Sequence, residues 1–376
     1  MITLLPEIAL VLVFIVAFLV TYLSIPSIVR LAQYKKFFDD PTHRKSHIRQ
    51  IPTLGGVAIF AGFSIAAGSL IGFNFVPSLQ YIMVACIIMF FIGVKDDIQV
   101  ISPNKKLLGQ IFAALILIIQ GEIFFSNIHG FLGIYNITVV PSLFLTLFVI
   151  ILIINSFNLI DGIDGLAASI GMLSTAFFGI WFFISGNIEY CLISAAMFGS
   201  LLAFFRFNVF GGKFKIFMGD TGSLVVGLII AVQLILFNEK NIGDSSEIFA
   251  KIESAPAVSF SVLIFPLYDT LRVFIIRMSR GRSPFAADKN HLHHCILKLG
   301  FSHIQSTMLI LLVNICFIAI ALLLQNLGIL FLMIIILSIA TILSFYIEHI
   351  VRKKGMIEKP KLKPKLFKEN ENEPLK

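Results

Sequence analysis

The sequence carries little charge. Of its 376 residues only 13% are Asp, Glu, Lys or Arg, whereas 58% are apolar and the mean hydropathy is +0.96. A soluble domain has about 25% charged residues, so this composition excludes an ordinary soluble domain and is typical of a membrane protein. Tryptophan is nearly absent, with one residue against 39 phenylalanines, which suits lipid-facing helices. The net charge of +8 does not indicate a nucleic-acid partner, because the basic residues lie in short loops between apolar runs.

Cysteine is also scarce. The cysteines form no CxxC pair and mostly lie inside apolar runs, so we expect neither a disulfide framework nor a zinc site and interpret them as small apolar side chains. The four are Cys86, Cys191, Cys295 and Cys316.

Long apolar runs fill most of the chain. Because a bilayer core takes about 20 apolar residues per helix, they predict an all-α, polytopic integral membrane protein with about eleven transmembrane helices. The first run has no positive n-region and is too long for the h-region of a signal peptide, so we interpret it as a retained helix with its N-terminus outside. Residues 1–350 are expected to form a single transmembrane domain, and residues 351–376 a basic, disordered cytoplasmic tail. The expected spans are 8–29, 54–73, 79–94, 107–125, 139–155, 166–184, 188–205, 222–238, 257–276, 305–325 and 327–347.

The basic residues predict the orientation. With the N-terminus outside, 27 of the 29 Lys and Arg residues fall on inner segments, and only Lys240 and Lys251 fall outside. The unusual polar sequences share that inner face, which indicates a functional site built there. They occupy 39–56, 95–97, 155–165, 217–223 and 280–294.

Two of these clusters are rich in carboxylates. Asp96 and Asp97 follow an apolar run, where acidic groups are costly and tend to be functional or paired. Since adjacent residues do not face the same way on a helix, we expect different roles for the two; a helix end entering water, with Lys95 as counter-ion, remains an equal alternative. Asn158, Asp161 and Asp164 recur every three residues, so they would line one face and offer oxygen ligands that suit Mg²⁺. A structural Asx-rich turn is the weaker alternative.

The segment 218–223, MGDTGS, leads into an apolar span. Asp220 or Thr221 as a helix N-cap is the commoner explanation of such a sequence. A helix N-terminus also favours a diphosphate, and a carboxylate there can hold the Mg²⁺ that bridges it. We favour this second interpretation because the other clusters share the same face.

The two basic inner loops are candidates for phosphate binding. Arginines at 272, 277, 280 and 282 can bind phosphates bidentately. The HLHH sequence at 291–294 raises a zinc alternative, but its adjacent Cys295 lacks ligand spacing, so hydrogen bonding or proton handling fits better. His303 is a weaker candidate for the same site. The first inner loop offers a phosphate grip, although a cationic loop is expected at any anionic membrane surface, and its glycine pair at 55 and 56 would allow close packing of the second span.

Taken in order along the chain, these motifs form a set that resembles that of a known family. The set DPxxRKxH, KDD, NxxNxxDGxDGL, FMGDTGSL and RGRSPFxxDxxHLHH resembles the polyprenyl-phosphate N-acetylhexosamine-1-phosphate transferases over roughly residues 8–347. That superfamily includes the enzymes that start enterobacterial common antigen, O-antigen and wall teichoic acid, and phospho-MurNAc-pentapeptide transferase. The histidine motif is similar to that of the GlcNAc-1-phosphate branch.

The resemblance implies roles for particular residues. Asp96 and Asp97 match the paired aspartates near the polyprenyl phosphate, with Asp97 the candidate for deprotonating or positioning it. Asp220 matches the principal Mg²⁺ ligand, and Asn158 is expected as a second metal ligand. The histidine motif, His291, His293 and His294, completes the catalytic set. Substrate contacts are expected from Lys45, His47, Asp161, Asp164, Asn208 and Arg282.

The implied reaction is Mg²⁺-dependent transfer of an N-acetylhexosamine-1-phosphate, GlcNAc-1-phosphate above all, from a UDP-sugar to undecaprenyl phosphate with release of UMP. Mn²⁺ is the expected substitute metal. The partners would be both substrates and the lipid bilayer, with no nucleic acid, and a homodimer is kept as an alternative because many members of the family are dimers. The expected location is the bacterial inner membrane, multi-pass, with a cytoplasmic active site. The alternatives are another UDP-HexNAc, phospho-MurNAc-pentapeptide transfer and, outside enzymes, a membrane transporter.

Overall fold

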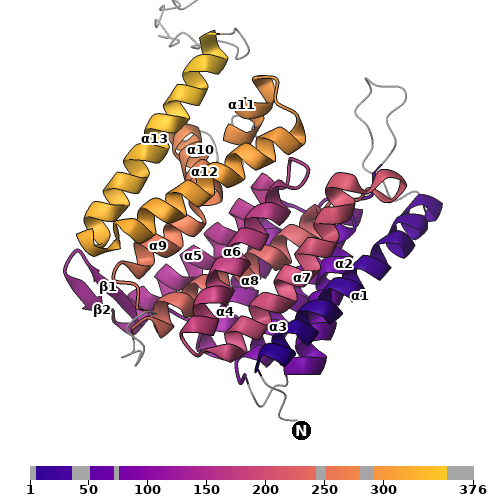
Figure 1. Ribbon diagram of the computed structural model, residues 1–376, viewed down its shortest axis with the longest axis horizontal. Coiled ribbons are helices and arrows are strands. Elements are labelled where there is room, and N and C mark those ends of the chain that lie inside the picture. Colours follow the sequence, from indigo (N-terminus) through magenta and orange to yellow (C-terminus); the bar gives the residue numbers. More distant parts are fainter. Residues whose placement is uncertain are drawn as a thin grey trace, which may run out of the picture.

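The computed structural model describes residues 6–35, 51–71, 76–242, 251–279, 281 and 291–353. In this part of the chain nearly all regular structure is helical, as predicted, and a two-stranded hairpin is the exception (Figure 1). The helices and strands are α1 (Pro6–Lys35), α2 (Gly55–Ala66), the π-helix η1 (Ala67–Ile71), α3 (Leu79–Ile98), α4 (Pro103–Ile119), β1 (Asn127–Phe131), β2 (Ile134–Asn136), α5 (Val139–Ile160), α6 (Leu166–Ile184), α7 (Ile188–Phe210), the 3₁₀ turn η2 (Gly212–Phe214), α8 (Gly219–Lys240), α9 (Ala255–Val262), α10 (Ile264–Ser279), α11 (Leu292–Lys298), α12 (His303–Leu323), the 3₁₀ turn η3 (Gln325–Leu327) and α13 (Ile329–Lys353).

Membrane-spanning helices make up most of the described chain. By length and composition, seven described helices can each cross a membrane, namely α1, α5, α6, α7, α8, α12 and α13, and the bent pair α9 and α10 would make eight. The all-α polytopic prediction is therefore confirmed. The remaining expected spans fall on α2 with η1, α3 and α4, so the count of eleven stays a prediction, as does the orientation.

The expected span 257–276 is wrong as a single straight helix. The chain breaks at Leu263, and α9 and α10 meet at an angle of 84°. Pro266 explains the break, because its ring lacks an N–H and collides with the carbonyl four residues earlier, which belongs to Val262. Asn314 of α12 satisfies the freed backbone groups: its amide nitrogen donates to Val262 O at 2.9 Å, and its oxygen accepts from Phe265 N at 3.3 Å.

Helix α8 lies at the centre of the bundle, where it packs against α2, α3, α5 and α6. Its residues from Thr221 to Asn238 are buried. Its start is fixed by backbone pairing, since Gly55 N donates to Phe217 O at 2.9 Å and Gly56 N donates to Met218 O at 2.8 Å. A Cβ added to Gly56 would stand 2.0 Å from Gly222 N, so the glycine pair does allow the close packing that the sequence predicted.

An antiparallel hairpin, β1–β2, follows α4 and was not expected from the sequence. It lies at the end of the bundle away from α11 (Figure 1). Glu239, near the end of α8, holds the chain there by accepting hydrogen bonds from Ser126 N at 2.9 Å and Ser126 Oγ at 2.6 Å. The polar C-terminal end of α8 thus anchors the connection between α4 and the hairpin.

The boundary expected at residue 350 falls inside α13, which continues to Lys353. The expected disordered tail lies outside the described residues from 354 onward.

Candidate active site

The predicted site residues gather around one cavity of about 730 Å³. It lies where the α3–α4, α5–α6 and α7–α8 connections meet the ends of α10 and α11, so segments far apart in the sequence share its wall. Nine predicted residues line it: Asp96, Asp97, Asn158, Asp161, Asp164, Asn208, Asp220, His291 and His294.

Asp97 caps the N-terminus of α8 from a different helix. Its Oδ1 accepts from Asp220 N at 2.7 Å, and its Oδ2 accepts from Thr221 N at 3.0 Å and from the Thr221 hydroxyl. The residue at the N-cap position is Met218, which has no capping side chain, so the alternative that Asp220 or Thr221 is the N-cap is wrong. Gly219 has φ +70°, and a Cβ there would stand 2.7 Å from Asp97 Oδ1, so only glycine fits this contact.

Lys106 contacts two carboxylates of the site, those of Asp96 and Asp220. Its Nζ lies 3.0 Å from Asp96 Oδ2 and 2.9 Å from Asp220 Oδ2, while Asp96 Oδ1 accepts from Ile101 N at 2.7 Å. Asp96 and Asp97 therefore have different partners, as adjacent residues on a helix should. In the sequence, Lys106 contributed only to the predicted orientation. Its position in the first turn of α4, ten residues after Asp96, was the signal that could have placed it in the site.

Asn158 and Asp161 approach α8 from the end of α5. The amide nitrogen of Asn158 donates to an oxygen of Asp220 and, at 2.9 Å, to Ser223 Oγ, so this amide holds the Asp220 carboxylate in place. Asp161 accepts a hydrogen bond from the backbone of Gly219. Burial raises the pKa of Asp161 well above its ordinary value, and the charges of Asp220 and Asp97 raise it further. Several carboxylates thus face one region, which favours binding of a cation.

Asp164 and Asn208 connect the loops on the other side of the cavity. Asp164 Oδ2 lies 2.6 Å from Lys215 Nζ and 3.5 Å from His303 Nδ1. Asn208 is buried, accepts from Gly165 N at 2.6 Å and donates to Ile216 O at 2.9 Å. Its amide therefore joins the α5–α6 loop to the α7–α8 loop, and its predicted substrate contact stays a prediction.

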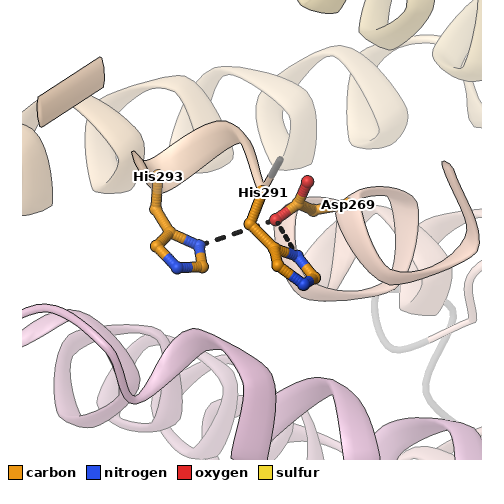
Figure 2. Close-up of side chains that lie close together, drawn as sticks. All are labelled: Asp269, His291 and His293. Carbon is orange, nitrogen blue, oxygen red and sulfur yellow. Dashed lines mark hydrogen bonds and ion pairs between the residues drawn. The ribbon is translucent and has the colours of Figure 1, made fainter. Parts of the chain in front are cut away.

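The histidine motif is arranged around Asp269 of α10, as Figure 2 shows. Asp269 Oδ2 lies 3.0 Å from His291 Nδ1 and 3.6 Å from His293 Nδ1, and the rings of His291 and His293 are stacked. His293 and His294 lie near Gly162, so the motif faces the α5–α6 loop. The pKa of His294 is lowered from its ordinary value of 6.5 to about 4, first by burial and then by the neighbouring His293 and His291. Asp269 was not predicted, and no sequence pattern links it to a histidine more than twenty residues away.

Of the four arginines expected to bind phosphate, Arg272 and Arg277 lie within the described residues. Arg277 is buried and lines the cavity. Arg272 instead contacts Asp269 at 3.1 Å and also Glu348 of α13. The predicted residues Lys45, His47 and Arg282 lie outside the described residues.

A pair of hydrogen-bonded amides, Gln110 and Asn155, also lines the cavity and was not predicted as part of the site. Asn155 Nδ2 donates to Gln110 Oε1 at 2.8 Å, and Gln110 Nε2 donates back at 3.4 Å. Gln110 lies one helical turn after Lys106, and Asn155 lies one turn before Asn158. Helical periodicity therefore could have predicted that these two amides face the same site.

Comparison with known proteins identifies the family. The model of glycosyl transferase family 4 matches residues 79–238. The decaprenyl-phosphate N-acetylglucosaminephosphotransferase of Mycolicibacterium smegmatis is 31% identical over 293 residues, covering 72% of this chain and 71% of that protein. The chain belongs to glycosyl transferase family 4. It is therefore an enzyme, which excludes the alternative that it is a membrane transporter.

Other members of family 4 are similar over comparable lengths. The undecaprenyl-phosphate alpha-N-acetylglucosaminyl 1-phosphate transferase of Escherichia coli K12 is 29% identical over 296 residues, 78% of each chain. The protein of the same name in Yersinia pestis is 29% identical over 275 residues, 72% of each chain. The segment matched by the family 4 model begins with α3 and ends within α8, so it contains Asp97, Lys106 and Asp220 but not the histidine motif.

Proposed function

We propose that this enzyme transfers an N-acetylhexosamine-1-phosphate, most simply GlcNAc-1-phosphate, from a UDP-sugar to undecaprenyl phosphate and releases UMP. The relatives named above carry N-acetylglucosamine and a polyprenyl phosphate in their names. The cavity supports the same chemistry, because it combines carboxylates that suit a metal ion with buried basic groups that suit phosphates. The transfer would start a cell-envelope glycan of the O-antigen, common-antigen or teichoic-acid type.

One observation carries the Mg²⁺ part of the proposal: Asp96 and Asp220 already converge on a single cation, the ammonium of Lys106. Carboxylate oxygens are the ligands that Mg²⁺ prefers, so these residues fit the metal, with Asp220 as the principal ligand. When bound, Mg²⁺ would neutralise the diphosphate of the donor. Asn158 supports this arrangement because its amide nitrogen donates to the Asp220 carboxylate, which leaves the amide oxygen as the atom that would bind the metal.

The protein groups act chiefly by alignment and charge. Lys106 and Arg277 bring positive charge to a cavity that must accept a diphosphate and a lipid phosphate. The amides of Asp220 and Thr221 at the start of α8 donate to Asp97, which fixes the position of this helix end at the cavity. Phosphoryl transfer depends mainly on such positioning and on charge neutralisation.

The contacts of Asp97 favour direct attack by the lipid phosphate. Both oxygens of Asp97 accept hydrogen bonds from the first residues of α8, so its use as a nucleophile or base would break the cap. A lipid phosphate is already anionic at neutral pH and needs little help from a base. A covalent phospho-sugar intermediate on an aspartate is the alternative course.

The proposal places the enzyme in a bacterial inner membrane with this cavity on the cytoplasmic side, where UDP-sugars are found. Its partners are the two substrates and the bilayer, and a homodimer remains an alternative to a monomer. Transfer of another UDP-HexNAc or of phospho-MurNAc-pentapeptide is the second candidate reaction, supported only by the shared superfamily motifs.

The test is a membrane assay with radiolabelled UDP-GlcNAc, undecaprenyl phosphate and Mg²⁺. We expect labelled lipid from the wild type, and its loss in Asp220→Asn, with EDTA and with excess UMP. Glu239→Gln is the matched control, because it changes a carboxylate at the other end of the same helix. Folded wild-type protein that labels no lipid from UDP-GlcNAc refutes the sugar assignment, and failure with every UDP-HexNAc refutes the reaction.

A further inference from the structure

Asp269 is a buried carboxylate for which the proposed mechanism has no use. The residue is 0% exposed and lies on α10, beyond the break at Leu263. Its Oδ1 accepts from Leu292 N at 3.0 Å and from Arg272 Nη2 at 3.1 Å, and its Oδ2 lies 3.0 Å from His291 Nδ1. One side chain therefore holds both the first turn of α11 and the first ring of the histidine motif (Figure 2).

We propose that Asp269 is a positioning residue that fixes His291 in the tautomer with hydrogen on Nδ1, leaving Nε2 to accept a hydrogen bond from the substrate in the cavity. The kinetic part of the proposal rests on the proposed function, whereas the tautomer does not depend on it.

The hydrogen-bond pattern determines the tautomer. Asp269 faces the guanidinium of Arg272 and a backbone N–H, and these contacts stabilise an ionised carboxylate, which can only accept hydrogen bonds. His291 Nδ1 must then carry the hydrogen in their 3.0 Å contact, and in a neutral ring Nε2 keeps its lone pair. His291 Nε2 is buried without a hydrogen-bond partner in the described part of the chain, and His291 lines the cavity. A buried acceptor of this kind is costly unless a ligand supplies the donor.

The arrangement continues beyond Asp269. Arg272 also pairs with Glu348 of α13, and Glu348 Oε2 lies 3.1 Å from Arg352 Nη2. Alternating charges from α10 and α13 thus keep Asp269 in one orientation. Such indirect support is how a neighbouring carboxylate orients a functional histidine ring.

A metal ion is the competing interpretation of the same group. Ligand atoms of Asp269, His291 and His293 all lie within 4.8 Å of one another. The hydrogen-bonded interpretation is favoured because this group contains one carboxylate, whose charge Arg272 already balances at 3.1 Å. Near Lys106, by contrast, Asp96, Asp161 and Asp220 leave an excess of negative charge for a metal ion. A bound metal would also require a lone pair on Nδ1 and would therefore reverse the tautomer.

The test combines ¹⁵N NMR of ring-labelled histidine with kinetics on purified full-length protein. His291→Gln identifies the His291 signal, and we expect the wild type to show a protonated Nδ1 and a bare Nε2. Asp269→Asn can turn its amide NH₂ toward Nδ1, so we expect it to move the hydrogen to Nε2 and to lower kcat by about 10- to 100-fold with KM for UDP-GlcNAc nearly unchanged. Glu239→Gln is the matched control and should keep both the spectrum and kcat.

Three results would overturn the proposal. The first is a wild-type His291 signal with hydrogen on Nε2, which does not depend on Asp269→Asn and therefore decides the question even if that variant does not fold. The second is a folded Asp269→Asn protein whose tautomer and kcat equal those of Glu239→Gln. The third is stoichiometric zinc in the wild type that Asp269→Asn loses. If the wild type transfers no sugar phosphate, the proposed function fails, but the tautomer measurement still decides the role of Asp269.

Discussion

At the scale of single residues, Lys106 is the group that allows Asp96 and Asp220 to lie in one cavity. The ammonium contacts one oxygen of each carboxylate at about hydrogen-bond distance, 3.0 and 2.9 Å. Without that charge, two carboxylates would face each other in partly buried surroundings, which is unfavourable. Lys106 and a bound divalent cation would therefore both reduce the repulsion between these two carboxylates.

Lys106→Met should consequently make the protein depend more on Mg²⁺. We expect kcat to fall by at least about tenfold, and Mg²⁺ to raise the melting temperature of the variant more than that of the wild type, because the ion replaces the lost ammonium. Thermal unfolding with and without Mg²⁺ measures this effect. The neighbouring Lys105 is exposed, so Lys105→Met is the control. Equal Mg²⁺ responses in Lys106→Met and wild type would contradict this role.

His294 gives the site a defined pH response. Its pKa is lowered from 6.5 to about 4, first by burial and then by neighbouring histidines, so between these values the unfolded chain binds a proton that the folded chain does not. The contribution of His294 to stability is thus complete above pH 6.5 and is lost as the pH falls toward 4. We expect the melting temperature of the wild type to fall more over this interval than that of His294→Gln. Parallel curves for the two proteins would show that this residue does not titrate as described.

At the scale of elements, the break between α9 and α10 orients Asp269 and Arg277 toward the site. Pro266 ends the straight helix, but a broken helix leaves backbone groups that need partners inside a bundle. Asn314 supplies both a donor and an acceptor and is itself fully buried. A single amide on α12 therefore stabilises the geometry of α10.

Asn314→Leu should destabilise the protein by about 1–3 kcal/mol, because it leaves Val262 O and Phe265 N without their partner. Activity should fall with it, since α10 carries Asp269. Reversible unfolding in detergent measures the first effect and the lipid-labelling assay the second. Ser261→Ala is the control: its hydroxyl bonds only within α9, to Ala257 O at 2.8 Å, and we expect little change. A loss of stability no larger than in Ser261→Ala would contradict the role of Asn314.

At the scale of the whole molecule, α11, which carries His294 of the cavity wall, and the hairpin lie at different ends of the bundle (Figure 1). The distribution of Lys and Arg predicts that the cavity end is cytoplasmic. Val100 beside the cavity and Tyr135 in the hairpin are 90% and 64% exposed, so both can carry a reporter.

A membrane-impermeant maleimide should therefore label Tyr135→Cys, and not Val100→Cys, in intact spheroplasts. Cys316 is the exposed cysteine among the four and is replaced first, with the parent lacking it as the control. Both positions should react after the membrane is opened. Labelling of Val100→Cys alone in intact spheroplasts would contradict the predicted orientation and show that the cavity does not face the cytoplasm.

The sequence by itself determined the class of protein, the positions of the helices and the set of motifs around the cavity. Apolar runs of bilayer length can only satisfy their backbone groups as helices, so the all-α fold follows from composition and periodicity. The clusters containing Asp97, Asp161, Asp220 and His291 could be grouped because each follows or precedes an apolar run on the same predicted face, and all four residues line one cavity.

The tertiary structure alone decided which group pairs with which. Asp97 caps α8 across a helix–helix contact, Lys106 reaches Asp220 from α4, and Asp269 binds His291 from another helix. None of these pairs has a characteristic spacing in the sequence. Helix packing, and not the period of a single helix, determines which side chains of different helices meet. For the same reason the bend at Leu263 needed Asn314 of α12 as well as Pro266 of its own segment.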